Sequence, residues 1–259
     1  MTADVLRLER PARPDFEREC VRAARPAILT GLMQEWSLAA SPPLRRFEPD
    51  GHRLVSVWQQ DASEWHPALG KKWVRAPLRD LLAEVERPQP KLFGVQMNLL
   101  THSWALDRFP VLPAISPLVG IGDIVEGNLW LQGSGNRTHL HYDLADNLHL
   151  LIQGKKRFVV FPPDQFANLY PVRDYEDLSK DASSNWSLVD AFRVDHERFP
   201  LFAAAKSLTI ELQGGDTLYL PRYWWHYVLT EDGPSCGINF WSRPPVPPPR
   251  PAWWRWYTQ

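Results

Sequence analysis

The sequence predicts a mainly β protein whose C-terminal half folds as a barrel or jelly roll. Short strand-like segments recur from Asn128 onward, and this close spacing is typical of such folds. The N-terminal half mixes helical and strand patterns, which predicts a decoration around the barrel. We therefore expect one structural unit in three parts: supporting helices and strands over 1–125, the barrel over 126–242, and a Pro- and Trp-rich extended tail over 243–259.

Local patterns predict the elements of the N-terminal part. Apolar residues recur at helical spacing in 14–24, where Asp15 is a candidate cap. The same spacing recurs in 76–86, which carries Pro77 near its first helical position. The segment 37–52 is rich in proline and charge and is typical of a loop. Strands are expected over 26–29, 53–58 and 92–99, and a Pro-broken connection with one short helix over 103–125.

Composition excludes several classes of partner. The formal net charge of −1 gives no bulk electrostatic field for nucleic acid or an anionic membrane, and 155–157 is a local basic exception. The sequence contains no apolar run approaching the roughly 18 residues of a spanning helix, so we expect no membrane association. The start lacks the apolar core of a secretory signal. Cys20 and Cys236 form no disulfide framework, which suits a reducing compartment. We therefore expect a cytoplasmic protein.

The stretch 136–157 contains candidate metal ligands. His141 and Asp143 lie two positions apart in a run that is typical of a strand, so their side chains share one face. A third candidate is His226, which we expect to close a strand that begins after Gly215. Two histidines and one carboxylate on one face of an octahedral ion leave three positions open, as in non-haem Fe(II) oxygenases. The pattern therefore predicts a metal centre of this type.

Two further histidines lie in the same stretch. His139 shares the strand parity of His141 and is an alternative ligand or a support behind the ligands. His149 follows on the next predicted strand and is expected to line the pocket. The spacing of His141 and Asp143 alone also fits a surface histidine beside a turn aspartate. The prediction therefore depends on the whole constellation.

A cation is expected inside the barrel. Lys156, Phe158 and Val160 share one face of an alternating strand, and we predict that this face is internal. A buried ammonium is costly unless an anion meets it, and a bound dicarboxylate is such an anion. The alternative is that Lys156 is a solvated member of the basic cluster 155–157. Further candidate contacts for the same diacid are the hydroxyl of Thr138 and the amides of Asn147 and Asn239.

Five ordered blocks resemble the JmjC-type, cupin-fold hydroxylases. They span Asn128 to Trp241, and the similarity is to members such as the asparaginyl hydroxylase of hypoxia-inducible factor and the hydroxylase of the wybutosine base in transfer RNA. The blocks read T-H-L-H-Y-D-L-A-D-N, Q-G-K-K-R-F-V-V-F-P-P-D-Q, E-R-F-P-L-F, G-G-D-T-L-Y-L-P-R-Y-W-W-H and G-I-N-F-W.

The resemblance implies a double-stranded β-helix, or jelly-roll, barrel and an oxygenase that depends on Fe(II) and 2-oxoglutarate. By position, the family's iron ligands fall on His141, Asp143 and His226. Its cosubstrate contacts fall on Thr138, Asn147, Lys156 and Asn239. The implied reaction is hydroxylation of an unactivated C–H bond on a peptide or protein side chain.

Other functions stay open at the level of sequence. A transfer RNA base hydroxylase is suggested by the likeness to the wybutosine enzyme. A cupin that binds metal without catalysis would be a binding module. Demethylation of methyl-lysine would use the same chemistry, although no chromatin-reading region accompanies the predicted barrel.

Overall fold

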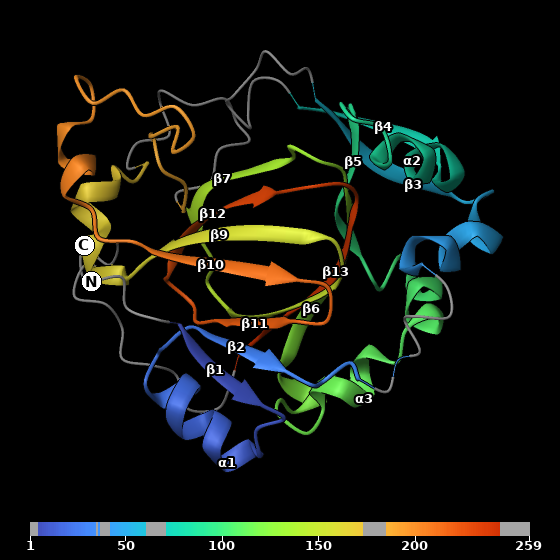
Figure 1. Cartoon of the computed structure of the whole chain (residues 1–259), viewed down its shortest axis with the longest axis horizontal. Helices are drawn as coiled ribbons and strands as arrows, with labels where there is room; N and C mark the ends of the chain where they lie inside the picture. Colours follow the sequence, from blue (N-terminus) through green and yellow to red (C-terminus); the bar gives the residue numbers. More distant parts are fainter. Residues whose placement is uncertain (1–4, 35, 37–41, 61–70, 173–184, 244–259) are drawn as a thin grey trace.

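The computed structural model describes residues 5–34, 36, 42–60, 71–172 and 185–243, and its strands form two sheets around a barrel (Figure 1). The N-terminal strands are β1 (Leu6–Glu9), β2 (Ala27–Thr30), β3 (Leu54–Gln60), β4 (Lys71–Pro77) and β5 (Leu92–Asn98). The barrel strands are β6 (Ile124–Gln132), β7 (Arg137–Tyr142), β8 (Asp146–Gln153), β9 (Lys155–Phe161), β10 (Leu208–Gln213), β11 (Thr217–Leu220), β12 (Trp225–Thr230) and β13 (Ser235–Ser242). The predicted mainly β, jelly-roll fold is confirmed.

The larger sheet continues from the barrel into the N-terminal decoration. Its nine strands follow the order β1-β2-β11-β8-β13-β6-β5-β3-β4, and the opposite wall of the barrel is the four-stranded sheet β10-β9-β12-β7. The N-terminal strands therefore extend both edges: β1 and β2 lie beyond β11, and β5, β3 and β4 lie beyond β6 (Figure 1). The supporting part and the barrel consequently share one sheet.

Strand β8 separates two apolar cores. Leu148, Leu150 and Ile152 pack with Phe16 in the larger core, on the side of the N-terminal helices. Side chains alternate along a strand, so the residues between them face the barrel. Leu151 belongs to the smaller core, which also contains residues of β9, β10 and β11. Asn147 and His149, which share the parity of Leu151, line the cavity of the barrel.

Helices pack against the outer side of the larger sheet. The helix expected over 14–24 is present as α1 (Arg13–Phe16) and a π-helical continuation, η1 (Glu17–Arg22). Its N-cap is Ala12 rather than Asp15, and no side chain caps it. The helix expected over 76–86 is α2 (Leu78–Val85), which contacts β3, β4 and β5. The connection over 103–125 contains η4 (Ser103–Arg108), α3 (Val111–Ile115) and η5 (Ile121–Asp123).

Two N-terminal expectations were incomplete. The segment expected as a loop contains the 3-10 helix η3 (Pro43–Asp50), which ends at Asp50, a buried carboxylate that binds Arg53 and Arg108. Strand β4 was not predicted, because K-K-W-V-R-A-P lacks an apolar alternation. It forms through pairing with β3 along its whole length, which shows tertiary context overriding local pattern.

One expectation about the barrel was wrong. His226 does not close the strand that begins after Gly215; it opens β12. The earlier strand, β11, ends at Leu220. Pro221 follows, and Tyr223 has φ of 69°, a left-handed conformation that a strand does not accommodate. The chain therefore turns before it reaches the histidine.

The predicted tail over 243–259 lies outside the described residues except for Arg243, as does the segment 173–184. No helix in the described part of the chain is both long and apolar enough to cross a bilayer.

A buried ion pair holds together the two turns beside the barrel mouth. Asp146 is 1% exposed and accepts hydrogen bonds from Tyr219 Oη at 2.8 Å, Arg222 N at 3.0 Å and Arg222 Nε at 2.9 Å. Next to this pair, the backbone N–H of Tyr223 donates to the carbonyl of Asp143 at 2.9 Å. The start of β8 is thereby fixed to the turn between β11 and β12.

Replacing Asp146 by alanine is expected to lower the free energy of unfolding by about 3–5 kcal/mol, because it leaves the buried Arg222 guanidinium without its partner. Urea unfolding followed by circular dichroism measures this change. The matched control is Asp15→Ala, which removes an exposed ion pair with Arg18 and is expected to cost about 0–1 kcal/mol. Equal unfolding midpoints for the two variants would show that the buried pair does not stabilise the fold.

Candidate metal centre

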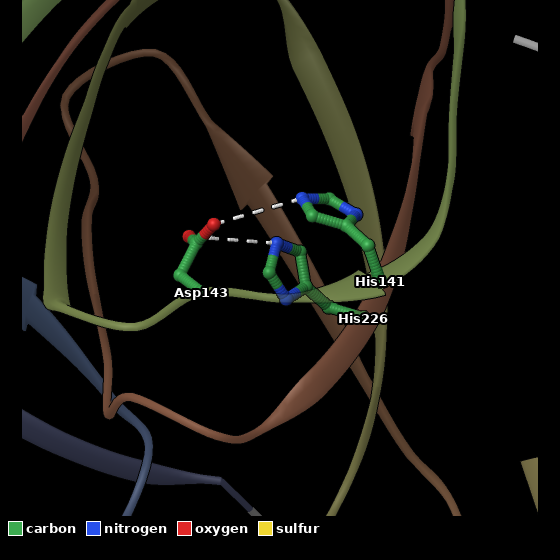
Figure 2. A group of neighbouring side chains, drawn as sticks. All are labelled: His141, Asp143 and His226. Atoms are coloured by element: carbon green, nitrogen blue, oxygen red, sulfur yellow. Dashed lines mark ion pairs between the residues drawn. The ribbon is translucent and has the colours of Figure 1, made fainter. Parts of the chain in front are cut away.

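Neighbouring strands bring the two candidate histidines together. His141 lies near the end of β7, and His226, the second residue of β12, is its direct antiparallel partner. The centroids of the two imidazoles are 4.2 Å apart. Asp143 follows immediately after the end of β7, in the turn to β8. Figure 2 shows the carboxylate of Asp143 facing a nitrogen of each ring.

The three side chains are close enough to share one ion. The carboxylate oxygens of Asp143 lie 3.8 Å from His141 Nε2 and 3.9 Å from His226 Nε2 (Figure 2). These separations are too long for direct hydrogen bonds. One ligand atom from each side chain lies within 4.8 Å of the others, and this is the only group of His, Cys, Asp or Glu with such spacing among the described residues.

Hydrogen bonds orient both rings for metal binding. His141 Nδ1 lies 2.7 Å from the carbonyl oxygen of His139, and His226 Nδ1 lies 3.1 Å from that of Trp224. A carbonyl only accepts, so Nδ1 carries the proton and Nε2 of the neutral ring keeps its lone pair. The two Nε2 lone pairs and the carboxylate of Asp143 converge on one point, where a cation would be bound favourably. The donor set therefore fits a divalent transition metal such as Fe(II).

The surroundings favour the ligating forms of these residues. Burial lowers the pKa of His226 to about 4, so the ring is neutral near pH 7. Trp241 Nε1 and Asn147 Nδ2 donate to Oδ2 of Asp143 at 3.0 and 3.3 Å. These bonds fix the carboxylate through Oδ2, while Oδ1 faces His141. Partners of this kind typically tune metal affinity.

Lys156 lies inside the barrel rather than in solvent. It is 3% exposed, and its ammonium donates to Gln132 Oε1 at 2.6 Å. The nitrogen also lies 5.7 Å from the centroid of the Trp130 ring. Burial lowers the pKa of Lys156 to about 7. The solvated alternative for this lysine is therefore excluded.

All predicted site residues line one cavity of about 340 Å³. Asn239 Nδ2 donates to Asn147 Oδ1 at 3.1 Å, and Trp130 Nε1 donates to Asn239 Oδ1 at 2.7 Å. Thr138 and His149 line the same cavity, as does His139. His139 does not join the three-residue group, so the structure does not favour it as a ligand. The predicted residues that it brings together are His141, Asp143, His226, Thr138, Asn147, Lys156 and Asn239.

Sequence reasoning missed two residues that act on this site. Gln132 accepts the hydrogen bond of Lys156, and Trp241 orients Asp143. A signal was present for Trp241, because it lies two residues after Asn239 and so shares its face of the strand. Gln132 carried no comparable signal, since its contact with Lys156 joins the two opposite sheets of the barrel.

A jelly-roll barrel with two histidines and one aspartate grouped in its cavity is typical of the cupin class. Residues 13–246 match the family described as cupin-like domain, and the chain belongs to this family. The predicted JmjC-type, cupin-fold membership is therefore confirmed.

Named relatives share this region. Jumonji C domain-containing protein 5 of Drosophila melanogaster is 29% identical over 92% of this chain, and the HSPB1-associated protein 1 homolog of Danio rerio is 40% identical over 45% of it. The human bifunctional peptidase and (3S)-lysyl hydroxylase JMJD7 is 27% identical over 90% of this chain. The matched regions span 59%, 25% and 82% of these relatives, so for the first two less than two thirds of the protein is represented.

Asp143→Ala is expected to weaken binding of Mn(II), a stable substitute for Fe(II), at least about 100-fold, because it removes the anionic ligand. Titration followed by electron paramagnetic resonance of free Mn(II) measures the dissociation constant. His139→Ala and the exposed Asp164→Ala serve as controls that keep wild-type affinity. Unchanged affinity in Asp143→Ala, or a large loss in His139→Ala, would contradict the assignment of ligands.

Proposed function

We propose that this protein is an Fe(II)- and 2-oxoglutarate-dependent oxygenase that hydroxylates an unactivated C–H bond of a peptide or protein side chain. The observation that carries the proposal is the pairing, in one cavity, of a His-Asp-His group with a buried lysine. The His-Asp-His group suits a metal ion, and the buried lysine suits the far carboxylate of a diacid that reaches it from the metal. The name of the human relative, a (3S)-lysyl hydroxylase, supports this class of reaction.

His141, Asp143 and His226 would hold Fe(II) by two Nε2 atoms and one carboxylate oxygen. Such a facial set leaves three positions for cosubstrate and dioxygen. When bound, Fe(II) would supply the site at which dioxygen, the oxidant, reacts: 2-oxoglutarate provides two electrons and becomes succinate and carbon dioxide, one oxygen atom of dioxygen enters succinate, and the other enters the substrate C–H bond. The contribution of the chain is to hold and orient the reactants and to exclude water.

Lys156 provides the charge for the far end of the diacid. Its ammonium is buried and donates a hydrogen bond to the neutral amide of Gln132. A carboxylate at this position would compensate the cost of desolvating the charge, and charge-assisted hydrogen bonds are stronger than neutral ones. Thr138 lines the same cavity and can donate its hydroxyl. Asn147 contacts Asp143, so it and Asn239 lie toward the metal-chelating end.

The substrate class rests on the relatives and on charge. The name of the human relative refers to lysyl hydroxylation, which supports an amino-acid side chain as the target. The transfer RNA alternative gains no support from the relatives named above, and the net charge of −1 offers no general attraction for RNA. Mass spectrometry of a cell lysate after incubation with the enzyme under isotopically labelled dioxygen would locate the modified residue.

Wild-type protein with Fe(II), 2-oxoglutarate and lysate is expected to form succinate, detected by proton nuclear magnetic resonance. Asp143→Ala is expected to lower the rate at least about 100-fold, because the metal is no longer held. Asp164→Ala makes the same aspartate-to-alanine change at an exposed position and should retain the rate of the wild-type protein. A folded wild-type protein that binds Fe(II) yet never consumes 2-oxoglutarate would leave the non-catalytic binding module as the better description.

The affinity for 2-oxoglutarate is expected to fall by up to about tenfold per pH unit between about pH 7.5 and 9. Burial lowers the pKa of Lys156 to about 7 in the free protein, while a bound carboxylate raises it. In the free protein, Lys156 is therefore charged below its pKa of about 7. The affinity for 2-oxoglutarate falls as the pH rises above this value, because the free lysine then loses its proton. His149 stays neutral because burial lowers its pKa, and Cys236 stays neutral because burial raises its pKa to about 12.

Isothermal titration of the Mn(II)-loaded protein measures this dependence. The control ligand is 2-oxovalerate, which keeps the chelating end but has a methyl group in place of the distal carboxylate. The control variant is Lys156→Met. Both should show weak binding with little dependence on pH in this range. A flat profile for the wild-type protein with 2-oxoglutarate would show that Lys156 does not bind the carboxylate as a titrating cation.

A further inference from the structure

His149 is a buried polar residue of the cavity that the roles described so far do not use. It lies on β8, is 5% exposed and lines the same cavity as the metal ligands. Its Nε2 atom is buried and has no hydrogen-bond partner among the described residues. Leaving such an atom unpaired costs free energy, and most buried polar groups of folded proteins are paired. A ligand in the cavity could supply the missing partner.

The imidazole leans toward the lysine end of the barrel. His149 lies opposite Asn239 in the pairing of β8 with β13, yet its Cε1 and Nε2 atoms are the nearest to Gly237, two residues before Asn239. A Cβ on Gly237 would lie 3.1 Å from both atoms. Gly237 is also opposite Trp130, whose ring faces the ammonium of Lys156. The free nitrogen is therefore displaced from the asparagines toward the lysine.

The neighbours of this ring keep it neutral and fixed. Its centroid lies 5.5 Å from that of Phe158, which meets it edge-on. Burial lowers the pKa of His149 well below its ordinary value, and the charge of Lys156 adds to the effect. A neutral imidazole carries one N–H, which can donate to an anion. The ammonium of Lys156 donates to Gln132, and no group among the described residues occupies the free nitrogen of His149.

We propose that His149 is a further recognition residue for the distal carboxylate of the diacid, donating a hydrogen bond from Nε2 in addition to the contacts of Lys156 and Thr138. This inference rests on the proposed function and adds a determinant of cosubstrate specificity to it. One cation alone attracts any anion, whereas several donors on different strands define a position for a carboxylate. His149 would thus help to select a diacid over a monoacid with the same chelating end.

Two substitutions separate hydrogen bonding from packing. His149→Phe keeps an aromatic ring against Phe158 and removes the N–H donor, while His149→Gln retains a donor. The Mn(II)-loaded variants are titrated calorimetrically with 2-oxoglutarate and 2-oxovalerate at about pH 7. We expect His149→Phe to weaken 2-oxoglutarate binding by about 10- to 100-fold, the range for a buried hydrogen bond to a charged group, and 2-oxovalerate binding by less than about twofold. His149→Gln should recover most of the lost affinity.

Gly237→Ala tests the same geometry without changing the histidine. The added methyl group would lie 3.1 Å from the ring atoms and must displace them, so the same selective loss of diacid affinity is expected. Thermal unfolding curves show whether each variant is folded. In turnover, the KM for 2-oxoglutarate should rise in His149→Phe while kcat at saturation changes little, because the residue does not contact the reacting atoms.

The results distinguish this inference from the proposed function. If the wild-type protein binds 2-oxoglutarate no better than 2-oxovalerate, the cavity does not recognise a distal carboxylate and both proposals fail. If the wild-type protein prefers the diacid but folded His149→Phe weakens neither ligand, or both equally, His149 has only a packing role and this inference alone is overturned. Failure of His149→Gln to recover affinity, with Gly237→Ala unaffected, would overturn it as well.

Discussion

The antiparallel register of β12 places His226 directly opposite His141, and the whole candidate metal site depends on this pairing. Side chains alternate along a strand, so a shift by one residue would turn His226 out of the barrel. Strand β12 lies between β7 and β9 and is paired with both, with Val160 of β9 as the second partner of His226. The register is therefore fixed from two sides. Metal ligands held in this way on rigid strands need little reorganisation when an ion binds.

The aspartate lies outside any strand and needs a different support. Asp143 follows β7, and its carbonyl accepts a hydrogen bond from Tyr223 in the turn that precedes β12. The buried pair of Asp146 and Arg222 joins the same two segments. A buried ion pair contributes little net stability compared with well-packed apolar residues, but it fixes one arrangement of the chain. Here that arrangement keeps the carboxylate within 3.9 Å of both imidazoles.

Much of the site could be predicted because strand parity determines which side chains face inward. Parity indicated that His141 and Asp143 point the same way and that Lys156 shares a face with Phe158 and Val160, but a solvated Lys156 stayed an open alternative. Parity could not separate His141 from His139, which has equal parity and also lines the cavity. The difference comes from the end of β7 and the position of β12, neither of which is local information.

Features that depend on contacts between distant segments were the ones missed. Strand β4 has no strong strand pattern and forms because β3 offers a free edge. Gln132 reaches Lys156 across the barrel, between the two sheets. The fold class and family were within reach because they follow from the order of several motifs. The partners of each side chain depend on register and packing, which a single sequence does not display.

Membership of a cupin-like family does not by itself separate an oxygenase from a metal-binding module, because one fold serves many functions. The interior of the barrel supports the proposed oxygenase. A module that only bound metal would have no use for a lysine that is 3% exposed and has a neutral amide as its hydrogen-bond acceptor. Its burial costs free energy that an apolar residue would not cost. Retaining that charge in the same cavity as the metal ligands is reasonable only if an anion binds between them, and a chelating diacid is such an anion.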